Sequence, residues 1–152
     1  MSPGSIHFTH GDLEHFIQVQ PLWEKLVQYH RDLGPRFEAF FRDADFKRRV
    51  ESLRKKTENG SFQAWLAWDA DQLVGYCAAS VYGTIGEIES LYVEPPYRGA
   101  KTGHMLVSKS LEWLNSQNVK KKVVSVGVGN DKVFGFYEQF GFFPRSLTLE
   151  QI

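Results

Sequence analysis

Residues 85–107 restrict the fold of this chain more than any other stretch of its sequence. They begin with an apolar run typical of a strand, pass through a short basic turn that contains Gly99 and Gly103, and end in a helical pattern. Pro95 and Pro96 set the exit of the strand, because neither can donate a hydrogen bond to a sheet. A helix that begins at glycines and cations is typical of an anion-binding turn, because its first N–H groups have no partner within the helix.

The spacing of apolar residues predicts the elements on either side of this stretch. Short alternating, aromatic or apolar runs predict strands, a repeat of three or four predicts helices, and Asp45 is suited to cap one of the helices. Because helices follow strands twice in the second half, we expect one α/β domain over residues 1–152, with a mixed sheet and helices on both faces. The expected elements are strand 5–9, helix 21–34, a second helical region 37–58, strands 61–69, 72–82 and 85–93, helix 103–117, strand 122–128, helix 132–140 and a last strand 142–150.

The composition is that of a folded protein and disfavours several classes of function. Apolar residues make up 42% of the chain and charged residues 24%. Lys+Arg and Asp+Glu both number 18, so we expect no nucleic-acid partner. No segment is apolar enough to span a membrane, and the cytoplasm is the expected compartment. The single cysteine, Cys77, excludes an internal disulfide and is expected to be a buried apolar residue, and the five histidines show no metal-ligand spacing.

The second half of the chain carries a family resemblance. The run from Leu91 to Leu106, the later Asn130 and the sequence F-Y-E-Q-F-G-F over residues 136–142 resemble the GNAT superfamily of N-acetyltransferases. The pyrophosphate signature of that family is Arg or Gln, two residues, Gly, one residue, then Gly or Ala. Arg98 and Gly103 match its ends, and Lys101 stands in place of the internal glycine. The resemblance implies a mostly antiparallel, twisted sheet in the order β-α-α-β-β-β-α-β-α-β, and the agreement in element order extends over nearly the whole chain.

The basic turn has two rival assignments, a nucleotide-binding loop and a plain helix cap. A nucleoside-triphosphate loop needs a glycine directly before its lysine and another five positions earlier, where Ala100 and Pro95 stand, so this assignment is excluded. A surface turn that only caps a helix is the plainer alternative, and the downstream motifs disfavour it. Lys101 either keeps an ordinary conformation and adds an ammonium near the phosphates, or crowds them with its side chain.

The resemblance implies acetyl-CoA as co-substrate and Tyr137 as the group that protonates the departing thiolate. The alternative for Tyr137 is a core tyrosine with a satisfied hydroxyl. Asn130 is expected to cap a helix and to contact the pantetheine arm, and the backbone of the strand before the turn is expected to pair with that arm. The implied acetyl-CoA-binding residues are Leu91, Tyr92, Val93, Arg98, Gly99, Ala100, Lys101, Thr102, Gly103, His104, Asn130, Phe134 and Tyr137.

A base must take a proton from the attacking amine, and two glutamates are candidates. Glu87 and Glu89 are two residues apart in the strand and so share one face, with Glu89 nearer the expected reaction centre. Each is about as well explained as a solvated side chain of the sheet. The family resembled often uses a carboxylate on this strand.

The expected function is transfer of an acetyl group from acetyl-CoA to a primary amine by direct attack. Another acyl-CoA as donor, or a non-catalytic CoA-binding regulatory module, are the alternatives. The acceptor is left open among polyamines, amino acids, aminoglycosides and protein amines, with Tyr29, Phe37, Phe40 and Phe41 as a possible apolar wall. Dimerisation is common in the family resembled, although no residue here argues for it.

Overall fold

The computed structural model describes residues 5–34, 36 and 42–152. Its sheet has five strands in the order β1-β2-β3-β4-β5, in which the first four run antiparallel and β5 runs parallel to β4. The mixed, mostly antiparallel sheet predicted from the sequence is therefore confirmed. The elements are β1 (Ile6–Gly11), α1 (Leu13–Phe16), η1 (Ile17–Val19), α2 (Gln20–Leu33), α4 (Phe46–Lys56), β2 (Ser61–Asp69), β3 (Gln72–Tyr82), β4 (Ile85–Val93), η3 (Pro95–Tyr97), α5 (Thr102–Asn115), β5 (Lys121–Val124) and α6 (Lys132–Glu138).

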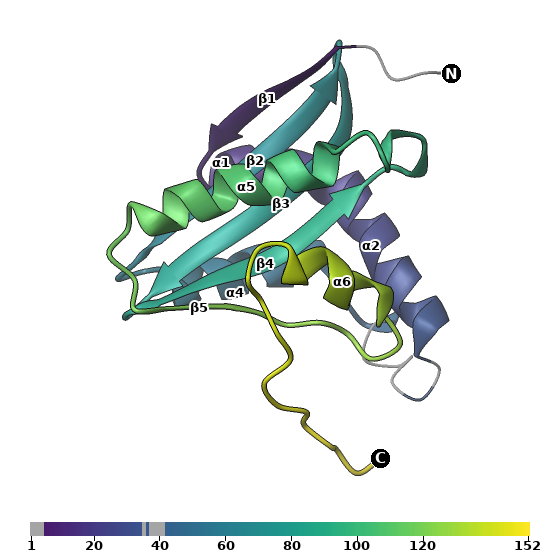
Figure 1. Cartoon of the computed structure of the whole chain (residues 1–152), viewed down its shortest axis with the longest axis vertical. Helices are drawn as coiled ribbons and strands as arrows, with labels where there is room; N and C mark the ends of the chain where they lie inside the picture. The colour runs from purple at the N-terminus through teal and green to yellow at the C-terminus, as the bar shows by residue number, and fades with distance from the viewer. Residues whose placement is uncertain (1–4, 35, 37–41) are drawn as a thin grey trace.

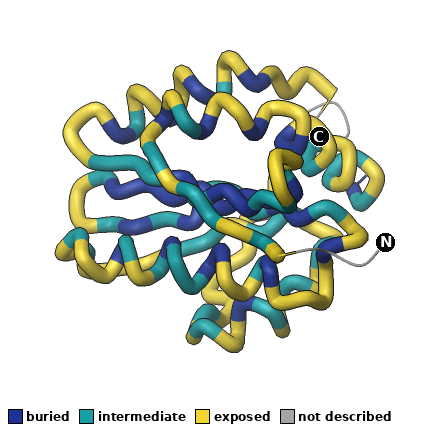
Figure 2. Tube along the Cα trace, turned by 90° about the horizontal axis from the view of Figure 1, so that it is seen from above, coloured by how far each residue is buried: buried dark blue, intermediate teal, exposed yellow. Residues whose placement is uncertain are grey.

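Helices cover both faces of the sheet, as Figure 1 shows, with α5 and α6 in front and α2 and α4 behind. Each face has its own apolar core, and the strands between them are the most buried part of the chain (Figure 2). Phe16, Leu53 and Tyr76 are fully buried on the side of α2 and α4, and Leu106 and Leu114 are fully buried on the side of α5. Burial of this apolar area is the main force that holds the layers together.

The local signals in the sequence located most elements well. The predicted strands 61–69, 72–82 and 85–93 have the observed bounds, and the Asp45 side chain caps α4 by accepting a hydrogen bond from the Arg48 N–H at 3.1 Å. Cys77 is buried, as expected, and burial raises the pKa of its thiol to about 12. The predicted helical residues 37–41, with Phe37, Phe40 and Phe41, lie outside the described residues.

The C-terminal predictions were partly wrong. The predicted strand 142–150 is not a strand, and its apolar residues Phe143, Leu147 and Leu149 are exposed. Pro144 cannot donate to a ladder, and a strand is stable only where another strand offers an edge. The predicted strand 122–128 also stops early, because the chain leaves the sheet after Val124.

After β5 the chain leaves the sheet and packs against the end of α2. Gly129 has a left-handed φ of +89°, and a Cβ there would lie 2.9 Å from the carbonyl oxygen of Leu33. Only glycine fits such a close approach without strain. The segment between β5 and α6 is therefore held over α2, and this separates it from β4. In the part of the chain that the structure describes, no helix is long and apolar enough to cross a bilayer.

Candidate active site

The β4 strand is paired with β3 along its whole length but with β5 along only its first half. It pairs with β5 from Ile85 to Ile88, where Ile88 lies opposite Val124, and within the described residues no strand continues that pairing beyond Ile88. The backbone of residues 89–93 therefore faces a gap on this side of the sheet. Main-chain groups of such an edge can pair with an extended ligand, as in recognition by strand addition.

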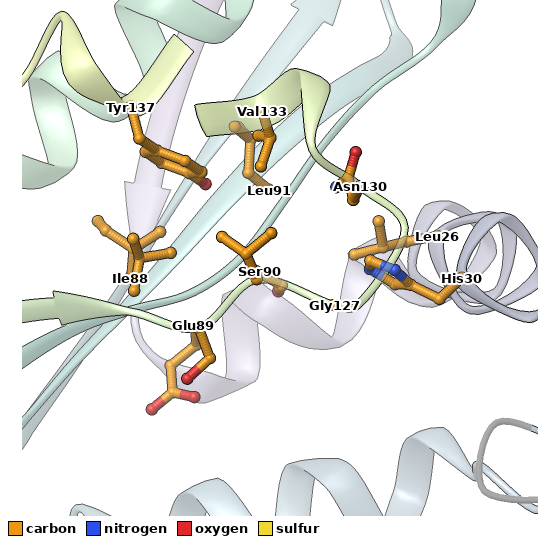
Figure 3. A pocket seen from close by; sticks show the side chains of 13 residues that line it. Leu26, His30, Ile88, Glu89, Ser90, Leu91, Gly127, Asn130, Val133 and Tyr137 are labelled. Carbon is orange, nitrogen blue, oxygen red and sulfur yellow. The ribbon is translucent and has the colours of Figure 1, made fainter. Parts of the chain in front are cut away.

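A cavity of about 110 Å³ lies at the point where β4 and β5 part. Figure 3 shows that its walls come from β4, from the segment after β5, from α6 and from α2. Its lining residues are Leu26, His30, Ile88, Glu89, Ser90, Leu91, Val124, Ser125, Val126, Gly127, Asn130, Val133 and Tyr137. The cavity thus brings the predicted Leu91, Asn130, Tyr137 and Glu89 together, although they come from three different parts of the chain.

A β-bulge at Glu89 turns main chain toward this cavity. Ser90 lies opposite Ala78 and Ile88 opposite Ala79, so Glu89 has no partner in β3. Its side chain is only 2% exposed, yet the residue as a whole is half-buried, so its accessible surface is main chain. The cavity is therefore lined at this point by backbone, and the carboxylate lies elsewhere.

The carboxylates of Glu87 and Glu89 form a charge cluster with α4. The Lys56 Nζ donates to Glu89 at 2.6 Å and to Glu87 at 3.0 Å, and the Arg49 guanidinium donates to Glu89 at 2.8 Å. The Ser80 hydroxyl adds a third donor to Glu89, at 2.6 Å. Burial raises the pKa of Glu89, but the hydrogen bonds from Lys56 and Ser80 and the nearby cations outweigh it and leave the pKa below its usual value. Glu89 is therefore ionised at neutral pH and is a weak proton acceptor.

Glu87 is held at the edge of the same cluster. Besides Lys56, the hydroxyl of Tyr82 donates to its carboxylate at 2.6 Å, and the Lys56 ammonium lies 4.6 Å from the centre of the Tyr82 ring. Burial, followed by the Glu87 carboxylate, raises the pKa of the Tyr82 phenol. The two glutamates share one face of β4, as their spacing predicts, and that face is turned toward α4.

Tyr137 reaches the cavity from α6. It is 7% exposed, and its ring packs edge-on against Phe136 and Phe142. Burial raises the pKa of its phenol, so the hydroxyl keeps its proton through the neutral range. In Figure 3 this hydroxyl points into the cavity toward β4, where a neutral phenol is suited to donate a proton.

The basic turn precedes α5 in an unusual conformation. Lys101 has a left-handed φ of +64° and Gly99 a φ of +85°, so Lys101 adopts the backbone that a glycine would adopt, and the alternative in which Lys101 keeps an ordinary conformation is wrong. The helical ladder starts at Lys101, whose carbonyl accepts from the Met105 N–H at 2.9 Å. The N–H groups of the next three residues are therefore without intrahelical acceptors, and this helix is long enough to have an appreciable dipole.

Arg98 ties this turn to the end of β4. Its Nε donates to the carbonyl oxygen of Val93 at 2.7 Å, and its guanidinium lies 5.3 Å from the centre of the Tyr92 ring. Arg98, Gly99, Ala100 and Lys101 are all exposed, whereas Thr102 is buried beneath them. The edge of β4 and the start of α5 thus form one continuous surface with its cations at the outer end.

The remaining predicted residues lie around this surface, with one correction. Asn130 does not cap α6, because Asp131 precedes the helix without a side-chain cap bond; Asn130 Oδ1 instead accepts from the Tyr29 hydroxyl at 3.2 Å. His104 packs on Phe140 at the start of α5, and Phe134 is 40% exposed on α6. Among the described residues, no group of three or more His, Cys, Asp or Glu side chains is placed to hold a metal ion.

Two lining residues on α2, His30 and Leu26, were missed by the sequence analysis. They are four residues apart, so they lie on one face of the helix, and Leu26 belongs to the apolar stripe whose spacing predicts this helix. Burial lowers the pKa of His30 below its ordinary 6.5, so its imidazole is neutral at neutral pH. A histidine that borders an apolar stripe one turn after a leucine was the available signal.

A larger groove of about 890 Å³ adjoins the cavity. It lies between β5 and the C-terminal segment 141–148, and it shares Tyr137 and residues 124–126 with the cavity lining. Glu87, Lys121, Lys122 and Arg145 also line it. The cavity is therefore bordered by a second space on the side away from the start of α5.

The sequence resembles those of known acetyltransferases. The sequence profile described as the acetyltransferase (GNAT) family matches residues 22–142. An uncharacterised N-acetyltransferase of Methanocaldococcus jannaschii is 31% identical over 64 residues, which are 42% of this chain. The matched part is only 28% of that relative's length.

Solved structures share the fold at low sequence identity. A candidate acetyl transferase from Pyrococcus furiosus is 23% identical, with a TM-score of 0.64 over 96% of this chain and 99% of its own. An acetyltransferase from Streptococcus agalactiae reaches a TM-score of 0.72 at 16% identity, over 97% of this chain and 90% of its own. An aminoglycoside acetyltransferase from an uncultured soil sample, solved with trehalose, reaches 0.62 at 16% identity, over 97% and 94%.

Proposed function

Because this chain belongs to the acetyltransferase (GNAT) family, we propose that it transfers an acetyl group from acetyl-CoA to a primary amine of a small molecule or peptide. The observation that carries this proposal is the cavity in which the bulged backbone of β4 faces the hydroxyl of Tyr137. A thioester carbonyl needs a hydrogen-bond donor at its oxygen and a proton donor at its sulfur, and these two groups supply both.

The surface from β4 to α5 fits the shape and charge of coenzyme A. The unpaired edge over residues 89–93 offers main-chain groups to the amide-bearing pantetheine arm. At its outer end, the free N–H groups of α5 and the cations of Arg98 and Lys101 offer donors and charge to a pyrophosphate. We assign Leu91, Tyr92, Val93, the turn 98–104, Asn130 and Phe134 to this binding surface.

Acetyl-CoA supplies an activated acetyl carbon, and the protein's residues orient the attack and move the protons. A main-chain N–H near the β4 bulge donates to the carbonyl oxygen and stabilises the charge that develops there as the amine nitrogen bonds to the carbonyl carbon. Tyr137 gives its phenolic proton to the sulfur as the carbon–sulfur bond breaks, and regains a proton from solvent. The amine nitrogen loses one proton, which a base must accept.

The sequence predicted Glu89 or Glu87 as the base. The ion pairs that both carboxylates make with α4 oppose that role. Protonation of Glu89 would weaken its bonds to both Arg49 and Lys56, and its carboxylate is turned from the cavity toward α4.

Two alternative functions can be distinguished from this one by experiment. A different acyl-CoA would be accommodated by the same backbone surface, and the small volume of the cavity favours a short acyl group. A CoA-binding module without catalysis is the second alternative, because Lys101 replaces a glycine of the family signature. Neither alternative requires a different fold.

A thiol-release screen tests the proposal. Acetyl-CoA is offered with polyamines, amino acids, an aminoglycoside and peptides that carry a free N-terminus or lysine, and propionyl-CoA is run in parallel. We expect CoA release with at least one amine, and thermal stabilisation by acetyl-CoA. Stabilisation without release over the whole panel would favour the regulatory module, and the absence of both would reject the proposal.

A further inference from the structure

The cavity has an imidazole on the wall supplied by α2. His30 lines the cavity together with Tyr137, and in Figure 3 the two side chains enter from opposite sides, from α2 and α6. We propose that His30 accepts the proton of the attacking amine, so that neither glutamate is the base. This inference rests on the proposed function and assigns the base within the same site.

The main chain seats the imidazole at this wall. A Cβ at Gly127 would lie 3.0 Å from His30 Nδ1, so the ring rests directly on the glycine backbone of the segment after β5. The neighbouring Tyr29 ring packs edge-on against it, with 5.8 Å between ring centres, and Tyr29 is itself bonded to Asn130. The ring is therefore oriented by two elements, which is what a group that must meet a reacting atom requires.

The ionisable groups around His30 differ in what they can accept. Among the described lining residues these are Glu89 from β4 and Tyr137 from α6, and residues 124–130 contribute none. Glu89 is ionised but holds two cations and a hydroxyl, and its carboxylate points away from His30 and Tyr137 in Figure 3. Tyr137 keeps its proton, because burial raises its pKa.

His30 is in the complementary state. Burial lowers its pKa, so the imidazole is neutral at neutral pH and able to accept a proton. The balance of the step is then complete: the amine nitrogen forms its bond to the acetyl carbon and passes a proton to a ring nitrogen of His30, and Tyr137 gives a proton to the departing sulfur. The two protons move at opposite sides of the acetyl carbon. His30 then loses its proton to solvent, and Tyr137 regains one from solvent.

The test is a pH profile of kcat with an acceptor found by the thiol-release screen. kcat reports ionisations in the enzyme–substrate complex, so wild type should lose activity as the pH falls through the pKa of its base. His30→Gln keeps a polar side chain but removes that base; we expect kcat about 10²-fold lower and the acid limb lost. KM for acetyl-CoA and stabilisation by acetyl-CoA should change little.

Two further variants complete the test. His30→Ala should regain part of its rate when imidazole is added, because free imidazole can occupy the space and accept the proton. His7→Gln makes the same change at an exposed histidine on β1, the opposite edge of the sheet from β5, and should leave both kcat and the limb unchanged.

Retention of the wild-type acid limb in His30→Gln would overturn the inference, as would a low kcat that imidazole does not raise in His30→Ala. Either result would leave the proposed function intact. Failure of wild type to release CoA with any amine would instead reject the proposed function, so the two failures are distinguishable.

Discussion

The β4 strand borders two polar regions that are built in opposite ways. The charge cluster beneath α4 contains Glu87, Glu89, Arg49 and Lys56, and each of these charges has an opposite partner within 3.0 Å. The cavity at the edge of β4 contains a phenol and an imidazole that burial keeps neutral. Opposite charges stabilise β4 on the side of α4, whereas the phenol and the imidazole in the cavity have the neutral protonation states that proton transfer requires.

The bulge at Glu89 connects the two regions. The Arg49 guanidinium donates to the Glu89 carbonyl at 3.4 Å as well as to the carboxylate, so the cluster holds both ends of the bulged residue. The same residue presents its main chain to the cavity. The cluster therefore sets the geometry of the backbone on which the proposed acetyl transfer depends, although it lies outside the cavity.

The largest expected effect is on stability, from Glu89→Gln. The amide cannot neutralise Arg49 and Lys56, which remain partly buried, and breaking a buried pair in this way costs up to about 5 kcal/mol. Because both cations are 28% exposed, we expect about 3 kcal/mol, measured by urea unfolding at pH 7. Glu51→Gln, at a side chain that is 60% exposed in a surface pair with Arg54, should change stability by less than about 1 kcal/mol.

The pH dependence of that difference provides an independent check. The folded-state pKa of Glu89 is depressed below 4.5, so its contribution is present above the unfolded-state pKa and is lost as the pH falls through the folded value. The stability difference between wild type and Glu89→Gln should therefore shrink below about pH 4.5. A difference that stays constant into acid would mean that the ion pairs contribute little.

The next effect is on catalysis, from Tyr137→Phe. Without the phenolic proton the sulfur must leave as a thiolate, and loss of a general acid costs about 10²-fold or more in kcat. Because only a hydroxyl is removed, stabilisation by acetyl-CoA should persist. Tyr97→Phe is the matched control: it removes a phenol bonded to Asp69 at 2.7 Å, outside the cavity, and should leave kcat unchanged. Equal activity of Tyr137→Phe and wild type would remove Tyr137 from the mechanism.

The sequence predicted the elements whose signals are local. The Ala70-Asp71 turn and Gly83 lie between aromatic or apolar runs, and the strands that they join were located to the residue. The last strand was wrong because a strand also needs a neighbouring edge, and periodicity contains no information about that edge. The bounds of β5 depend on the close approach of Gly129 to Leu33, a contact between distant segments.

The candidate site was only partly predictable for the same reason. Tyr137, Asn130 and Leu91 were located by a motif, which specifies residues without specifying their surroundings. The cations that hold Glu89 come from α4, and their sequence positions, 40 and 33 residues away, do not indicate contact. His30 requires knowledge of which face α2 turns to the sheet, and a histidine at the edge of an apolar stripe is compatible with more than one rotation of the helix.

The smallest expected effect comes from the basic turn. The charge of Lys101 is exposed there, unlike the groups of the charge cluster and of the cavity. Lys101→Gly should relieve the left-handed strain at φ +64° and stabilise the fold by about 1 kcal/mol, while loss of the ammonium weakens CoA binding by a few-fold. Lys101→Asn separates the two effects, because asparagine tolerates that conformation but carries no charge. Calorimetry with CoA should therefore show equally weakened binding in both variants, and urea unfolding should show a larger gain of stability for the glycine variant. Tighter CoA binding in both variants would mean that the lysine side chain crowds the phosphates instead of pairing with them.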